Sequence, residues 1–154
     1  MMAPASALHA NTLGVLNLGD GSLTTLIENP IEGTGYAFYD VRAGDGVFAW
    51  VEMNFASSSW ELYAQNLSGA SLSGDVVELD RGGKDYDPPL FTAFGSSAIC
   101  YKMPSAGSNK TSIDSFCYRH SLDKSKAETI WKSTGRFASA PRVSDGILTI
   151  SPRV

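Results

Sequence analysis

YDVRAGDG-VFAWVEM (39–53) decides the fold, because its pattern recurs as DPPLFTAFG-SSAICYKM (87–103) and SAPRVSDG-ILTISP (139–152). Each copy consists of a stretch of small or polar residues, then a glycine, and then an apolar strand. Trp50, Cys100 and Ile150 fall at matching places, fifty residues apart each time. Self-similarity at a fixed period indicates a repeat architecture.

A second pattern lies between these copies, in which a strand ends on a leucine just before a polar turn and a further short strand follows. Each repeat unit is therefore predicted to hold four short strands rich in Val, Ile, Tyr, Phe and Trp. No segment holds the 3.6-residue apolar period of a helix, so we expect an all-β chain. The matching segments are LGVLNLGDG (13–21), WELYAQNLSG (60–69) and SFCYRHSLDK (115–124), with Leu18, Leu67 and Leu122 before the turns, and LTTLI (23–27), DVVELD (75–80) and AETIWK (127–132) after them.

Four antiparallel strands recurring every 40 to 50 residues are typical of β-propeller blades. Twelve strands make about three blades, whereas propellers close with about four to eight. Two readings stay open: the chain is a segment of a larger ring, or two chains complete a six-bladed ring by dimerisation. The predicted parts are a flexible leader (1–12), a half blade (13–27), two blades (36–80 and 86–132) and a second half blade (137–151), so that 13–154 is a propeller segment.

Composition excludes several classes of function. The 154 residues are 43% hydrophobic and 10% aromatic, which is enough to bury a core. With a net charge of -4 and no basic run, nucleic acid is not an expected partner. Apolar runs are far shorter than the roughly 18 residues of a membrane span. The two histidines have no Cys, Asp or Glu at ligand spacing, so we expect no bound metal and no cofactor. No G-x-S-x-G elbow occurs, and we do not expect the chain to be an enzyme.

The stretches YDPPLFTAFGSSAICYK (86–102) and SAPRVSDGILTI (139–150) resemble the blade-opening motif of TolB-type, WD40-like (PD40) β-propellers. In that motif an Asp or small residue, a Pro, a Ser or Thr and then Asp-Gly precede the second strand. The chain departs from it at Val41, near the place of the Pro, and at Phe94-Gly95, in place of Asp-Gly. The resemblance covers about residues 13 to 151.

This resemblance implies a six-bladed, extracytoplasmic propeller, periplasmic or at the cell surface, that serves as a binding scaffold and is often one module of a larger protein. Related propellers gate serine peptidases of the prolyl oligopeptidase type. The alternative function is therefore an accessory segment of a larger hydrolase.

The connections between blades are the predicted binding site, because in propellers they run over one face toward the central channel. Tyr36, Asp85, Tyr86 and Arg136 are expected around one mouth, where they would bind a protein, peptide or glycan. Loops on a rigid scaffold concentrate function, and Tyr and Arg are common anchors. The alternative is that each is an ordinary residue of a solvated loop.

Three further side-chain expectations can be checked. Cys100 and Cys117 are expected directly opposite each other on adjacent strands, either as buried thiols or as a cross-strand disulfide. His120, at a strand end, is expected to face solvent. Residues Asp20, Asp45 and Asp145 each precede a glycine and are expected to form turns.

Overall fold

The computed structural model describes residues 12–106, 114–123 and 126–151. Residues 1–11 of the predicted leader lie outside the described residues. The described chain forms twelve β-strands and no helix, which confirms the predicted all-β class. The strands are β1 (Leu13–Leu16), β2 (Leu23–Ile27), β3 (Ala37–Gly44), β4 (Val47–Asn54), β5 (Ser59–Ser68), β6 (Ser71–Gly82), β7 (Leu90–Phe94), β8 (Ser97–Lys102), β9 (Ser115–Ser121), β10 (Glu128–Ser133), β11 (Arg142–Ser144) and β12 (Ile147–Thr149).

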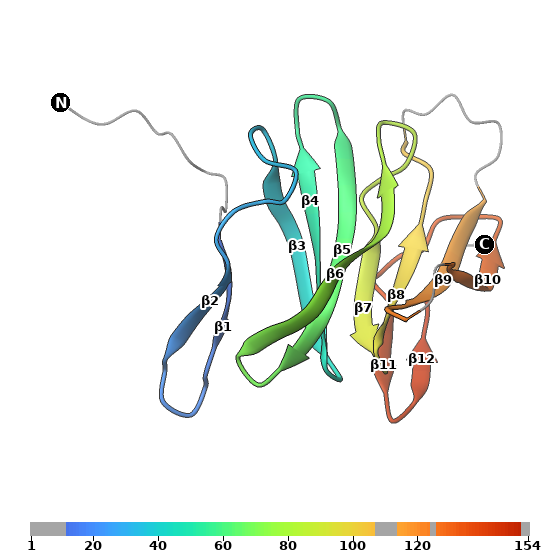
Figure 1. Cartoon of the computed structure of the whole chain (residues 1–154). Helices are drawn as coiled ribbons and strands as arrows, with labels where there is room; N and C mark the ends of the chain where they lie inside the picture. Colours follow the sequence, from blue (N-terminus) through green and yellow to red (C-terminus); the bar gives the residue numbers. More distant parts are fainter. Residues whose placement is uncertain (1–11, 107–113, 124–125, 152–154) are drawn as a thin grey trace.

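These strands form four antiparallel sheets in chain order. A two-stranded sheet, β1-β2, is followed by the four-stranded sheets β3-β4-β5-β6 and β7-β8-β9-β10, and then by the two-stranded sheet β11-β12. Figure 1 shows the first three succeeding one another across the molecule from blue to orange, with β11-β12 drawn below β7 and β8 in this view. Each strand within a sheet pairs with its sequence neighbour, so every connection inside a sheet is a hairpin.

The fifty-residue recurrence corresponds to three equivalent hairpin turns. Each turn places two central residues at positive φ, the conformation of the type I′ turns whose twist suits a two-residue hairpin. The expected turn role of the Asp-Gly pairs is confirmed, but in the middle copy the pair is Gly95-Ser96 and not Phe94-Gly95. The pairs are Asp45 (φ 48°) with Gly46 (φ 78°), Gly95 (φ 54°) with Ser96 (φ 56°), and Asp145 (φ 52°) with Gly146 (φ 75°).

Three apolar layers separate the four sheets. The first, around Trp50, packs β1-β2 against β3–β6. The second, around Cys100, packs β3–β6 against β7–β10, and the third packs β7–β10 against β11-β12 and includes Ile150. Each matching position of the repeat thus points toward the preceding sheet. Along one edge of the stack, β3 contacts β7 and β7 contacts β11.

Candidate functional site

Three segments connect the last strand of one sheet to the first strand of the next: 28–36, 83–89 and 134–141. They lie at the end of the sheets opposite the three left-handed turns (Figure 1). We call this end the crossing end. All four predicted ligand residues belong to these segments, namely Tyr36, Asp85, Tyr86 and Arg136.

Three of these four residues come together. The Arg136 guanidinium forms an ion pair with Asp87 and donates to the Pro104 carbonyl oxygen, which brings it beside residues 85–87. Asp85 is exposed, and its carbonyl accepts from the amide of Ser105 at 3.0 Å. Segment 83–89 is therefore fastened to the strand end after β8 and to the segment that precedes β11.

Tyr36 occupies a different part of the crossing end. Its side chain is hydrogen-bonded to Ser59 and lies near Glu61. Burial, followed by the negative charge of Glu61, raises the pKa of the Tyr36 phenol. The contacts found among the described residues do not join Tyr36 to the other three predicted ligand residues.

A buried glutamate that the strand pattern did not predict holds segment 28–36. Glu52 is fully buried, and its carboxylate accepts hydrogen bonds from the amides of Ile31 (2.9 Å) and Glu32 (3.0 Å) and from the Trp50 indole (3.0 Å). The hydroxyl of Tyr63 donates to Glu32. A charged residue at an inward position of VFAWVEM was the available signal, because a carboxylate is rarely buried without partners.

Glu61 lies beside this anchor and is less well satisfied. It pairs across the sheet with Glu52 on one side and with Arg81 on the other. Its side chain is buried, and its Oε2 atom has no hydrogen-bond partner among the described residues. Burial, followed by the negative charge of Glu32, raises the pKa of Glu61 to about 7. The positive charge of Arg81 opposes this rise only in part.

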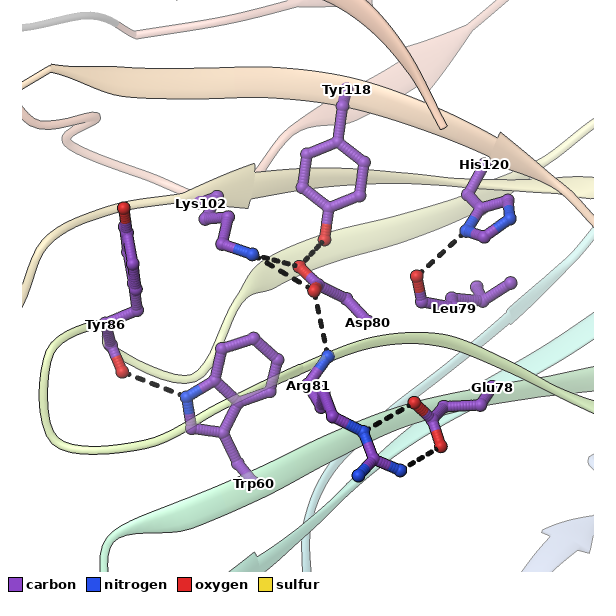
Figure 2. Close-up of polar contacts among 9 residues, drawn as sticks. All are labelled: Trp60, Glu78, Leu79, Asp80, Arg81, Tyr86, Lys102, Tyr118 and His120. Atoms are coloured by element: carbon purple, nitrogen blue, oxygen red, sulfur yellow. Dashed lines mark hydrogen bonds and ion pairs between the residues drawn. The ribbon is translucent and has the colours of Figure 1, made fainter. Parts of the chain in front are cut away.

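A second polar cluster joins the two four-stranded sheets (Figure 2). Asp80 on β6 accepts from the Tyr118 hydroxyl at 2.7 Å and from Lys102 Nζ at 3.1 and 3.2 Å. The Lys102 ammonium also lies 5.1 Å from the centre of the Tyr86 ring. Across the same interface, Trp60 Nε1 donates to the carbonyl oxygen of Tyr86 at 2.9 Å. These contacts fix segment 83–89 against both sheets.

The prediction that His120 faces solvent is wrong. The side chain is buried, and its Nδ1 lies 2.9 Å from the carbonyl oxygen of Leu79 on the neighbouring sheet (Figure 2). The sheet β3–β6 covers this face of β9, so a position that looks like an exposed strand end is part of an interface between sheets.

The predicted direct opposition of the cysteines is also wrong. Cys100 lies opposite Tyr118, and Cys117 lies opposite Tyr101. Successive residues of a strand point to opposite faces, so Cys100 points into the second apolar layer and Cys117 into the third. Both are buried free thiols, so the expected thiol burial is confirmed but the thiols do not lie together. Burial raises the pKa of both, that of Cys117 to about 11.

The described segments, with gaps at 107–113 and 124–125, contain no group of three His, Cys, Asp or Glu residues placed to hold a metal ion. They also contain no helix long and apolar enough to cross a membrane. The polar groups that do cluster, around Glu52 and around Asp80, hold loops and sheets together. Their arrangement can position the side chains of the crossing end.

No family model matches this chain, and no curated protein matches it either.

Proposed function

We propose that this chain is a non-catalytic β-propeller scaffold whose crossing end binds a protein, peptide or glycan. In this proposal the four-stranded sheets β3–β6 and β7–β10 are blades, and β1-β2 and β11-β12 are parts of blades. Membership of the TolB-like family and an extracytoplasmic location are parts of the same proposal.

The contacts between first strands support the blade arrangement. Strand β3 contacts β7, and β7 contacts β11, so the first strands of successive sheets approach one another along one edge of the stack. Each connection between sheets leads from the last strand of one sheet to the first strand of the next. Both features are typical of blades arranged around an axis. Such blades pack on one another because a single small sheet cannot bury its two faces alone.

The observation that carries the binding proposal is that every crossing segment is held by at least one hydrogen bond to another part of the chain. Glu52 holds the amides of Ile31 and Glu32, Trp60 holds the carbonyl of Tyr86, and Arg136 reaches Pro104. Loops ordered in advance lose less conformational entropy on binding. The crossing end is therefore suited to recognition.

Exposed side chains at this end supply contact area. Tyr39 near the start of β3 and Phe55 in the β4–β5 turn are both about half exposed, with ring centres 6.2 Å apart. Ile31 is exposed on segment 28–36, and Asp85 is exposed on segment 83–89. An aromatic pair and an exposed acidic side chain at the same end of the sheets fit a peptide or sugar with both apolar and polar groups.

A peptide display library and a glycan array, each probed with the whole chain, test this proposal. Phe55→Ala and Asp85→Ala should weaken binding of a selected ligand by 10-fold or more, because both side chains are exposed at the crossing end. Val76→Ala is the control, since Val76 is also exposed but lies within β6, away from the crossing segments. Equal binding by all three variants, or no ligand from either library, would contradict the proposal.

A further inference from the structure

We infer that two copies of this chain close into one ring, with β12 of each copy pairing with β1 of the other. The inference rests on the blade arrangement proposed above. Each junction would complete a four-stranded sheet in the order β11-β12-β1-β2, so that two copies would form six complete sheets.

The two-stranded sheets are complementary halves. Sheet β11-β12 holds the first two strands of a unit, because its turn at Asp145-Gly146 matches the turns between β3 and β4 and between β7 and β8. Sheet β1-β2 holds the last two, because Leu18 matches Leu67 and Leu122 at the end of the third strand. Within the described residues, β1 pairs only with β2 and β12 only with β11.

Both complete sheets specify the register of such a junction. The amide of Leu67 donates to Gly46 at 2.8 Å, and the amide of Leu122 donates to Ser96 at 3.1 Å, residues fifty apart in the repeat. By the same rule, the amide of Leu18 would donate to the partner's Gly146. The pairs Ala49 with Ala64 and Ile99 with Arg119 then set Thr149 opposite the partner's Val15.

Exposed apolar side chains lie on the faces of β11-β12 and β1-β2 that the second copy would cover. Ile147 is 70% exposed, whereas Val47, its match in the repeat, is 0% exposed because the sheet β7–β10 covers it. Ile147 would lie on the same side of the joined sheet as the partner's Leu13 and Val15, which line the first apolar layer.

The leucines of the other half-sheet show the same contrast. Leu67 and Leu122 each pack on the layer that precedes their sheet. Leu18, which matches them, is 91% exposed, and the opposed pair Leu16 and Leu23 is 57% and 72% exposed. In the joined sheet these three leucines would cover the partner's third apolar layer.

The two free edges carry nothing that would prevent pairing. Strands at sheet edges are normally protected by charged residues or Pro. Neither β1 (LGVL) nor β12 (ILT) contains one. Since one half-sheet supplies what the other lacks, the occupant that fits each edge is the opposite half-sheet of a second copy.

Light scattering on the full chain during size exclusion should give twice the 16.4 kDa mass of one chain. Ile147→Lys and Leu16→Asp should each halve that mass and leave the far-ultraviolet circular dichroism unchanged, because both side chains are exposed within one copy. Val76→Lys, at an exposed site on β6, should keep the double mass. A wild-type monomer at high concentration, or three or more copies, would overturn the inference.

A cysteine pair tests the register. Val15→Cys with Thr149→Cys should form a covalent dimer under mild oxidation, since opposed strand residues have Cα separations that a disulfide spans. Val15→Cys with Arg142→Cys is the control, because Arg142 lies one strand further from the junction. Equal crosslinking of both pairs would overturn the register. A monomer that still binds a selected ligand at the crossing end would overturn ring closure but leave the proposed function intact.

Discussion

Glu61 carries a carboxyl group whose Oε2 atom has no hydrogen-bond partner among the described residues. It is buried, it pairs across the sheet with another carboxylate, Glu52, and Arg81 is the positive group that faces it. Glu32 and Glu78, which are also acidic, lie near it as well. Protonation is therefore favoured in the folded chain.

This raised pKa makes stability depend on pH. The folded chain keeps the Glu61 proton up to about pH 7, whereas the unfolded chain releases it near the ordinary value of 4.5. The folded state binds more protons in between, so the free energy of unfolding should fall as pH rises from about 4.5 to 7, by on the order of 1–3 kcal/mol. Glu61→Gln should flatten that fall and be more stable than the wild type at pH 8. Urea titrations across this range measure it, and parallel curves for the two proteins would contradict the account.

The thiols give a second test at the residue scale. Cys100 and Cys117 are fully buried with raised pKa values, and the reactive species is the thiolate. A thiol reagent at pH 8 should label neither cysteine in the native chain and both after denaturation without reductant. Finding no free thiols in the denatured chain would show that a disulfide exists.

At the scale of elements, the carboxylate of Glu52 connects β4 to segment 28–36. The two carboxylate oxygens of Glu52 accept separately from the amides of Ile31 and Glu32, and Glu52→Gln turns one of these acceptors into a donor. We expect a loss of about 1–3 kcal/mol of stability and faster hydrogen exchange at those two amides. Glu28→Gln, at an exposed position of the same segment, is the control and should change neither. Unchanged exchange at both amides in Glu52→Gln would show that the anchor is not needed.

The apolar layers contribute more to the free energy of unfolding than the crossing segments do. Trp50 is fully buried in the first layer, and Trp50→Ala should cost about 3–5 kcal/mol. Tyr86 is only partly buried against the second layer, so Tyr86→Ala should cost about 1–2 kcal/mol, more than an ordinary solvated loop residue would. Chemical denaturation measures the free energy of unfolding of both variants. A larger loss for Tyr86→Ala than for Trp50→Ala would contradict this description of the core.

Strands and turns were predictable from sequence because their signals are local. The Asp-Gly pairs fix the hairpins, and the alternating apolar residues identify the strands. The register is not a local property: the sequence predicts Cys100 opposite Cys117, whereas Cys100 pairs with Tyr118, and this shift of one residue places Cys117 on the other face. The burial of His120, Glu52 and Glu61 depends on which sheet or segment covers them, and strand patterns do not contain that information.

At the scale of the whole molecule, the central claim is that the sheets fan around an axis and do not stack as parallel layers. A fan brings the first strands of neighbouring sheets closer together than the last strands, whereas parallel layers keep both separations equal. The repeat supplies matched positions. Arg42 and Thr92 lie fifty residues apart on first strands, and Glu78 and Thr129 lie on last strands, where they pair with the matching residues Tyr63 and Tyr118.

Spin labels on cysteines at 42 and 92, and separately at 78 and 129, measure the two separations, since the buried native thiols are not expected to react. The account predicts a clearly longer distance between the last strands than between the first. Equal distances for the two pairs would contradict it.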